Sequence, residues 1–339
     1  MKKDLNRILI ETTVRKTIKQ IQDDPERSTR NLIDMSLNFS EGRFQHHFLK
    51  TAQDMLKNEH SCYYQIIPDA VSTIDTERMI TFGINVGYNS CTNGAATIRS
   101  IEEKENFNIP WSISLEINGT DYYNKDQMYI SLIEQGQKLG IYTWIIYVHD
   151  AIVPILELVE KFPQCAFIIF CSPSEITDAL LDESNELYNL MYVIEFSNGV
   201  EDACSLLRSR NFLYSIYYPY QEYDVDKIIN GDILSDTEIL HPVFTIFYAY
   251  PPCPQNIRTQ VYQYVQYTRT EQKYKTIPFD MIYDNHFIDG IISDQACSIG
   301  FTQDGKCYSV LGQSVEERYN FFDCPLKEIL QQVSPKKSL

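Results

Sequence analysis

The chain has 339 residues, of which 44% are hydrophobic, and its formal net charge is −17 at pH 7. This composition supports a large core and excludes a disordered chain. The excess of negative charge repels phosphates, so we expect no nucleic acid and no anionic membrane among the partners. No uncharged apolar run reaches the ~18 residues of a membrane span, and MKKDLNRILIETT lacks the apolar stretch of a signal peptide.

The nine cysteines are scattered along the chain, odd in number and free of any CxxC pair. A small secreted domain held by disulfides would pair its cysteines at regular spacings. We therefore expect an acidic protein of the reducing cytoplasm whose thiols are free.

Residues 1–77 are predicted to form an N-terminal helical segment. LNRILIETTVRKTIKQIQ has apolar residues at helical spacing, DDPERSTRNLIDMSLNF opens with an acidic cap and Pro25, and FQHHFLKTAQDML has the composition of a third helix.

Residues 78–283 are predicted to form a full or partial parallel (β/α) barrel, because apolar runs alternate there with helical stretches. The runs are apolar at nearly every position, which is typical of strands covered on both faces. A repeat of about 25 to 30 residues predicts right-handed βαβ units, and a doubly wound open sheet is the alternative. The expected strands are MITFGINV, WSISLEI, YTWIIYVH, AFIIFC, LMYVIEF, FLYSIYYP, HPVFTIFYAY and PFDMIYD.

Residues 284–339 are predicted to form a small C-terminal α+β extension. CSIGFTQDGKC indicates a hairpin with Asp304 and Gly305 at its tip, and CPLKEIL indicates a closing helix. Cys297 and Cys307 flank this hairpin and Cys324 follows it, so the three thiols are candidate metal ligands. The alternative is that they are free, buried thiols.

Candidate catalytic residues stand at the ends of the expected strands, because βα loops build the pocket of a parallel barrel. Glu116, His149 and Glu195 offer mixed nitrogen and oxygen ligands for Zn or Mn, or they are ordinary polar residues that end strands. Cys171 is a candidate nucleophile activated by His149, or it is a buried thiol.

The order of these elements resembles a radical S-adenosylmethionine (radical SAM) barrel with a SPASM-like C-terminal extension. TFGINVGYNSC stands where that family has its CxxxCxxC cluster loop, SISLEINGTD resembles the strand before its GGEP-type turn, and IGFTQDGKCYSVLG with CPLKEIL resembles its tail. The resemblance implies that contacts to S-adenosylmethionine or an iron–sulfur cluster, where either binds, fall on Tyr88, Asn89, Cys91, Asn118, Asp121 and Ser197.

The cluster motif itself is degenerate, since Cys91 stands alone where three thiolates would be needed to hold a [4Fe–4S] cluster. The glycines around it, Gly83, Gly87 and Gly94, are expected to give this loop positive φ angles. We therefore expect a pseudoenzyme that binds a peptide or partner protein, such as an active maturase, in a peptide-modification pathway, with aromatic contacts near Tyr248 and Tyr250. The alternative is an active enzyme, either a radical SAM peptide maturase with atypical cluster ligation or a metal-assisted barrel hydrolase.

Overall fold

The core of the protein is one curled sheet of nine strands, seen in a computed structural model that describes residues 2–21, 24–38, 43–309 and 319–336. The strands lie in the order β7-β6-β5-β4-β3-β2-β1-β8-β9. All neighbours are parallel except β8 and β9, which form an antiparallel hairpin. The strands are β1 (Ser112–Ile117), β2 (Thr143–Val148), β3 (Ala166–Cys171), β4 (Leu190–Glu195), β5 (Tyr214–Tyr220), β6 (Phe244–Ala249), β7 (Ile277–Asp280), β8 (Ile299–Phe301) and β9 (Cys307–Ser309).

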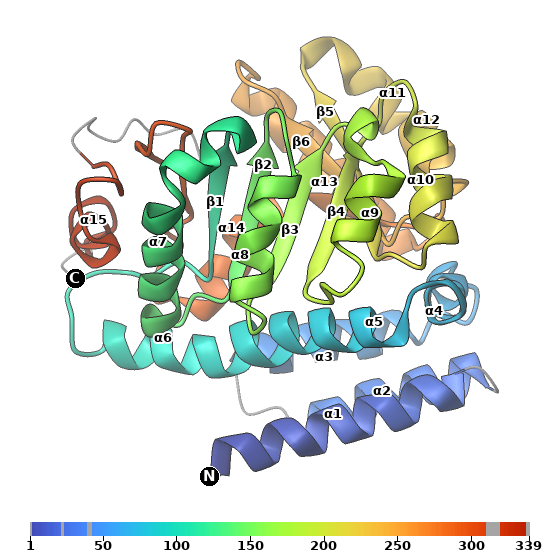
Figure 1. Ribbon diagram of the computed structural model, residues 1–339. Helices are drawn as coiled ribbons and strands as arrows, with labels where there is room; N and C mark the ends of the chain where they lie inside the picture. Colours follow the sequence, from blue (N-terminus) through green and yellow to red (C-terminus); the bar gives the residue numbers. More distant parts are fainter. Residues whose placement is uncertain (1, 22–23, 39–42, 310–318, 337–339) are drawn as a thin grey trace.

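The prediction of a partial parallel (β/α) barrel is confirmed. From β1 to β7 each strand pairs with the next in sequence, whereas a doubly wound sheet would reverse its strand order at an interior switch point. The helices that follow β1 to β4 cover the outer, convex face of the sheet, and those after β5 and β6 extend this cover (Figure 1). They are α7 (Asp126–Leu139), α8 (Leu156–Lys161), α9 (Asp178–Glu183), α10 (Val200–Ser209), α11 (Val225–Ile229), α12 (Asp232–Glu238) and α13 (Gln255–Glu271).

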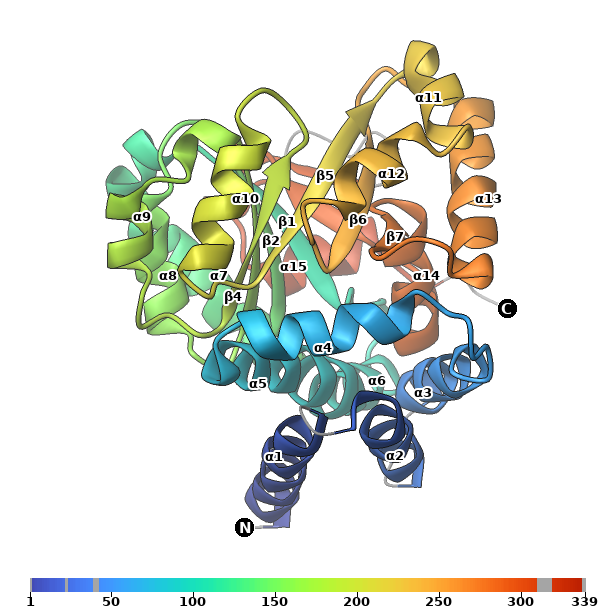
Figure 2. The ribbon, with the colours of Figure 1, turned by 90° about the vertical axis from the view of Figure 1, so that its right-hand side faces the viewer.

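A layer of helices lies beneath the amino-terminal ends of the strands, and α1 and α2 lie farther out (Figures 1 and 2). Arg15 of α1 joins the two levels by an ion pair with Glu77. None of the helices in the described ranges is long and apolar enough to cross a membrane. The helices before β1 are α1 (Lys2–Ile21), α2 (Pro25–Asn38), α3 (Arg43–Met55), α4 (Tyr63–Thr73), α5 (Thr76–Ile84), the π-helix η1 (Asn85–Gly94) and α6 (Ala95–Glu102).

The expected first strand and its cluster loop are wrong, because residues 76–102 form one continuous helical rod from α5 through η1 to α6. Asp75 caps its start by accepting hydrogen bonds from the backbone N–H groups of Glu77 and Arg78. The glycines do not provide positive φ either, since Gly94 has φ −61°. Gly94 instead allows a close approach of two backbones, because a Cβ there would collide with the carbonyl oxygen of Gly140.

Buried polar side chains of the π-helix donate hydrogen bonds to the loop that precedes β3. The Asn85 amide nitrogen donates to the carbonyl oxygens of Pro163 and Cys165, both at 2.9 Å. Asn89 donates to the Asn85 side-chain oxygen at 2.8 Å and to the Gln164 carbonyl at 2.9 Å. These bonds pair the carbonyl groups of the loop before β3, where Asn189 also donates to the Cys165 carbonyl at 3.1 Å.

Arg78 pairs the carbonyl groups of the loop before β4. Its guanidinium donates to the carbonyl oxygens of Asn185 at 2.5 Å and Leu187 at 2.7 Å, and it lies 3.7 Å from the centre of the Phe212 ring. The rod is thus held under the sheet by hydrogen bonds to backbone as well as by apolar packing.

The C-terminal extension packs at the free edge of β1. It follows α14 (Tyr283–Ile292) with the β8–β9 hairpin and ends in α15 (Leu326–Val333), with Gly305 at φ +81° in the hairpin turn as expected. The predicted boundaries at 77/78 and 283/284 both fall within helices, α5 and α14.

Two buried carboxylates fix this extension to the barrel. Asp289 accepts hydrogen bonds from the backbone N–H groups of Trp111 and Cys297, and Glu102 accepts from those of Ile109 and Asp294. Burial raises the pKa of Asp289 to about 6 and that of Glu102 to about 7, although these hydrogen bonds favour the charged forms.

The first testable prediction concerns the polar row of the rod. Asn85→Ala removes three hydrogen bonds and leaves the Pro163 carbonyl without its side-chain donor, while the Cys165 carbonyl keeps only the hydrogen bond from Asn189, so we expect it to lower the free energy of unfolding by about 2–3 kcal/mol. Asn93→Ala, the same substitution in the same helix at a side chain that is only half buried, should cost less than about 1 kcal/mol. Urea denaturation of both variants measures the difference, and equal costs would contradict the role given to Asn85.

The second prediction concerns pH. A carboxyl group whose pKa is raised on folding stabilises the fold fully below its unfolded pKa, and that stabilisation is lost as the pH rises through the folded value. For Asp289, whose pKa rises from 3.8 to about 6, the loss between pH 4 and 7 amounts to about 2 kcal/mol. Asp289→Asn should therefore be most destabilising near pH 4 and progressively less so toward pH 7. An unfolding penalty that is the same at both pH values would show that Asp289 is charged throughout.

Candidate functional site

The carboxyl-terminal edge of the sheet brings Glu116 and His149 together. Glu116 is in β1 and His149 follows β2, and the imidazole Nε2 lies 3.6 Å from the Glu116 carboxylate. Burial raises the pKa of Glu116, the nearby Asp304 carboxylate raises it further, and His149 opposes both effects. The two side chains, 34% and 44% exposed, can exchange a proton with each other and with a molecule at this edge.

The concave face of the sheet is filled by its own aromatic side chains. Side chains alternate along a strand, and the inward positions of β2, β3, β5 and β6 include Tyr147, Phe170, Tyr217 and Tyr248. The Tyr147 ring lies 4.7 Å from that of Phe170 and 5.5 Å from that of Tyr248, between ring centres. Because β2 and β6 are not neighbours, this last contact spans the hollow of the half-barrel.

The tyrosines of this face are held in their neutral form. Burial raises the pKa of Tyr248 to about 12 and raises that of Tyr147 and Tyr308 well above the usual value, with the Glu116 carboxylate adding to each shift. Tyr217 donates a hydrogen bond to Glu195 at 3.0 Å. Glu195 is therefore joined to Tyr217 at this edge, whereas Glu116 is joined to His149.

A polar pocket of about 200 Å³ opens beside this edge, between the loop after β1 and the turn of the β8–β9 hairpin. The Lys125 ammonium crosses it, donating to the Gln303 carbonyl at 3.4 Å and lying 4.9 Å from the Phe322 ring. The residues that line the pocket are Asn118, Asp121, Lys125, Tyr129, Gln303 and Asp304. Two of the predicted cofactor contacts, Asn118 and Asp121, thus share a pocket with the extension.

The loop after β1 owes its shape to Asp150. The Asp150 carboxylate accepts hydrogen bonds from the backbone N–H groups of Gly119 at 2.6 Å, Thr120 at 3.3 Å and Ala151 at 2.7 Å. Gly119 is required here, since a Cβ at this position would collide with the Ala151 carbonyl group. The loops after β1 and β2 are therefore fixed to each other, which holds the wall of the pocket in place.

Exposed apolar side chains surround the same edge. Tyr123 is 65% exposed and Tyr250 is 56% exposed, and each stands in a loop that follows a strand. We call the set the apolar rim; its members are Tyr123, Met128, Val153, Tyr223 and Tyr250. A rim of this kind beside a polar pocket is typical of surfaces that bind other molecules.

Cys171 is a buried thiol, the alternative to the candidate nucleophile activated by His149. Its side chain is 2% exposed and packs in the core between the sheet and the outer helices, on the opposite face from Phe170. Burial raises its pKa, so it is a thiol rather than a nucleophilic thiolate.

The predicted cofactor residues before β1 lie at the other end of the molecule. Asn89 and Cys91 are buried in the π-helix beneath the amino-terminal ends of the strands, and Tyr88 packs toward α1. Tyr88 therefore fills no cofactor space in the barrel. Ser197 follows β4 at the carboxyl-terminal edge of the sheet, where it is exposed.

No group of three or more His, Cys, Asp or Glu side chains in the described ranges is placed to hold a metal ion. Glu195 thus does not complete a site with Glu116 and His149, and Cys297, Cys307 and Cys324 do not form one in the extension. Cys297 lies beside Asp289, whereas Cys307 packs in the main core. All nine cysteines are free.

These positions do not fit a [4Fe–4S] cluster at the carboxyl-terminal edge. Such a cluster needs three neighbouring thiolates, and Cys91 lies in a helix under the opposite edge, where burial raises its pKa to about 12. We derive no chemistry through a cluster for this chain.

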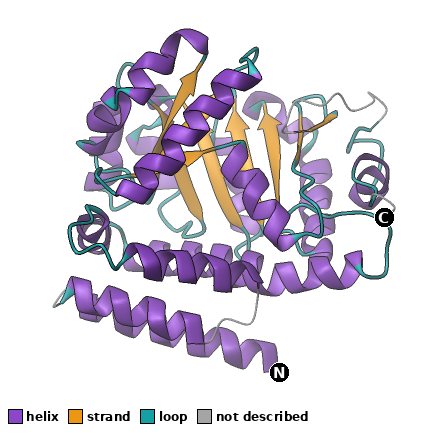
Figure 3. Cartoon of the chain, turned by 180° about the vertical axis from the view of Figure 1, so that it is seen from behind, coloured by secondary structure: helices purple, strands orange, loops and turns teal. Residues whose placement is uncertain are grey.

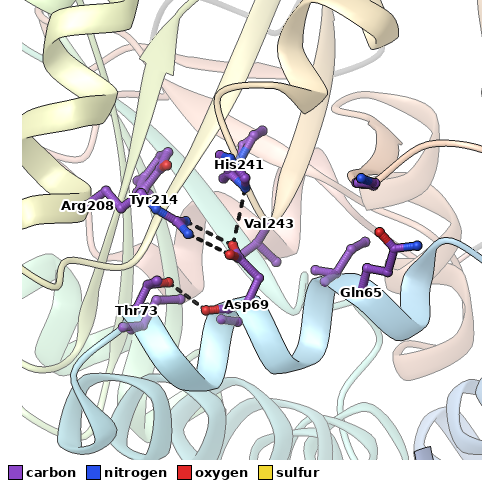
Figure 4. A pocket seen from close by; sticks show the side chains of 12 residues that line it. Gln65, Asp69, Thr73, Arg208, Tyr214, His241 and Val243 are labelled. Atoms are coloured by element: carbon purple, nitrogen blue, oxygen red, sulfur yellow. Dashed lines mark hydrogen bonds and ion pairs between the residues drawn. The ribbon is translucent and has the colours of Figure 1, made fainter. Parts of the chain in front are cut away.

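A second pocket, of about 130 Å³, lies at the amino-terminal edge between α4 and the starts of β5 and β6 (Figure 4). Arg208 reaches it from α10 and makes two hydrogen bonds to Asp69 of α4, at 2.5 and 2.9 Å. His241 also approaches Asp69, with 3.6 Å between Nδ1 and the carboxylate.

Sequence reasoning finds Asn118 and Asp121 of the first pocket but not the other residues that shape the two pockets. Lys125 and Gln303 belong to no motif, and Asp304 is predicted only as part of a turn. Asp69 and Arg208 are 139 positions apart, so only the fold reveals their pairing.

No protein-family model matches this chain, and no curated protein matches it in sequence. Among solved structures it is similar to SuiB of Streptococcus suis, whose crystal structure was determined bound to S-adenosylmethionine. The two chains are 10% identical, the TM-score is 0.49, and the alignment covers 72% of this chain and 68% of SuiB. Similarity at this level carries no information about chemistry, so the site is interpreted from its own residues.

The third prediction tests the cysteines. Cys91 and Cys171, each 2% exposed and with raised pKa values, should not react with iodoacetamide in the native protein at pH 8. The partly exposed Cys324 should react, and Cys62, which is partly exposed but whose pKa burial also raises, should react more slowly than Cys324. Peptide mapping by mass spectrometry, with and without denaturant, gives the order of labelling. Labelling of Cys171 as fast as that of Cys62 in the native protein would restore it as a candidate nucleophile.

Proposed function

We propose that this chain is a catalytically degenerate, radical-SAM-like half-barrel that binds a peptide or a partner protein at the carboxyl-terminal edge of its sheet. In this proposal it acts in the cytoplasm, in a peptide-modification pathway, beside an active maturase. The observation that carries the proposal is the contact between Tyr147 and Tyr248 across the hollow of the half-barrel.

This contact matters because a (β/α) barrel enzyme encloses its substrate at the carboxyl-terminal ends of the strands. Here Tyr147, Phe170, Tyr217 and Tyr248 occupy that space themselves, as one connected aromatic cluster. A ligand at this edge therefore lies across the mouth of the half-barrel rather than inside it, which suits an extended segment of polypeptide better than a small enclosed substrate.

The apolar rim and the charges beside it indicate what such a segment would contain. Tyr123 and Tyr250 offer large apolar contacts with few rotatable bonds, which are favoured at protein interfaces. Glu116, Asp121 and Asp304 lie at the same edge, in a chain with a net charge of −17. Basic and aromatic residues in the bound segment would complement both features.

An acid–base enzyme is the second candidate, and the Glu116–His149 pair favours it. The raised pKa of Glu116 beside an imidazole is an arrangement that active sites use. We place it second because the pair lacks a third group that orients it: the described hydrogen bonds give His149 no other side-chain partner than Glu116.

The fourth prediction tests binding directly. A displayed library of random twelve-residue peptides, selected on the wild-type protein, should yield binders rich in basic and aromatic residues. The double variant Tyr123→Ser, Tyr250→Ser should bind these peptides at least about tenfold more weakly, because truncating aromatic anchors at an interface typically costs roughly 1–2 kcal/mol each. Tyr267→Ser is the matched control, since Tyr267 is 57% exposed but lies on α13 away from the edge.

Two outcomes would contradict the proposal. Equal binding by the double variant and by Tyr267→Ser would remove the apolar rim from the interface. Anaerobic reconstitution that loads about four irons per chain, as a cubane cluster requires, would favour the radical SAM enzyme with atypical ligation.

A further inference from the structure

The pocket at the amino-terminal edge gathers basic side chains in an otherwise acidic protein. Its charged lining residues are Asp69, Arg208, His241 and Lys275, so bases outnumber acids there although the chain carries a net charge of −17. Figure 4 shows Arg208 and His241 both directed at the Asp69 carboxylate, Arg208 from the left and His241 from above. Asp69 neutralises Arg208, and the side chain of Lys275 makes no ion pair among the described residues, although the Glu238 carboxylate accepts a hydrogen bond from the Lys275 backbone N–H at 2.7 Å.

His241 is held over this pocket by the turn that ends α12. Its φ is +57°, the left-handed conformation that commonly ends a helix, and its backbone N–H donates to the Glu238 carbonyl at the end of α12. The next residues, Pro242 and Val243, lead directly into β6 and line the pocket themselves. The imidazole is about half exposed, so it can meet a ligand as well as Asp69.

The rest of the wall is apolar. Ile66, Ala70 and Ile74 line the pocket from α4, and Val243 faces them from the start of β6. A volume of about 130 Å³ equals the space of roughly four water molecules at ~30 Å³ each, which suits a molecule of about six non-hydrogen atoms. The ligand that matches this pocket has a short hydrocarbon chain and an anionic head.

We propose that the pocket binds a small aliphatic carboxylate, with its head between His241 and Lys275 and its chain against Ile66 and Val243. A carboxylate matches these donors because both groups present N–H bonds and positive charge when protonated, and charge-assisted hydrogen bonds of this kind are strong. Arg208 stays paired to Asp69 and sets the position of α4. This site lies at the opposite end of the sheet from the proposed peptide surface and does not depend on it.

Butyrate is the probe that tests the proposal, because it has six non-hydrogen atoms and one negative charge. Titration at pH 6 into protein labelled at its isoleucine and valine methyl groups should give saturable shifts of the Ile66 and Val243 signals in NMR spectra. Butylamine, the same chain with a positive charge, should give none. Inorganic phosphate should bind more weakly than butyrate, because it lacks the chain that contacts the apolar wall.

Two variants separate binding from folding. Lys275→Gln should weaken butyrate about tenfold by removing one charge. His241→Asn should do the same, and asparagine tolerates the left-handed backbone, so the fold should survive. The double variant Tyr123→Ser, Tyr250→Ser should bind butyrate like the wild type. Binding of butylamine as tightly as butyrate, undiminished affinity in Lys275→Gln, or no saturable shift with butyrate would each overturn the proposal.

Discussion

The hydrogen bonds from Asn85, Asn89 and Arg78 to the loops beneath the strands are the constraint on which the structure depends. Each αβ loop at this edge turns carbonyl groups toward the protein interior, and buried carbonyls need donors. The rod of residues 76–102 supplies these donors from one side, because its π-helix places Asn85 and Asn89 against the same loop. The rod thus lies under the amino-terminal ends of the strands, on the side of the sheet opposite the loops that build the carboxyl-terminal edge (Figure 3).

The concave face of the sheet is the second feature that the fold must accommodate. A sheet of seven sequential parallel strands curls because of its twist, and its concave face must be filled or hydrated. Here β2, β3, β5 and β6 each contribute an aromatic residue near the open edge, and the rings meet across the hollow. The hydroxyl groups of Tyr147 and Tyr217 are neutral at physiological pH, because burial raises the pKa of both. The Glu116 carboxylate adds to the shift of Tyr147, and Tyr217 donates a hydrogen bond to Glu195. These aromatic side chains thus stabilise the curvature of the sheet and fill the space in which a barrel enzyme binds its substrate.

The repeating part of the fold could be predicted from the sequence, and the segment before it could not. Seven of the eight expected strands are β1 to β7, because runs such as AFIIFC are apolar on both faces and only a covered parallel strand buries both. MITFGINV has the same composition but forms a helix. Asn85 within it and Arg78 and Asn89 beside it are spaced for one helix face. That face is explained only by the carbonyl groups of loops about 80 to 110 positions away.

Some residues of the candidate sites could be predicted from the local strand pattern, and others meet only in the folded chain. Glu116, His149, Asn118 and Asp121 follow strands, so their edge was predictable from the strand pattern alone. Cys171 also ends a strand, yet the two-residue alternation places it on the helix-covered face, since Phe170 faces inward. The pocket around Asp69 was beyond any local pattern, because helix α4, the end of α10 and the start of β6 meet only in the folded chain. Its lining carries more basic than acidic side chains, in contrast to the net charge of −17 of the whole chain.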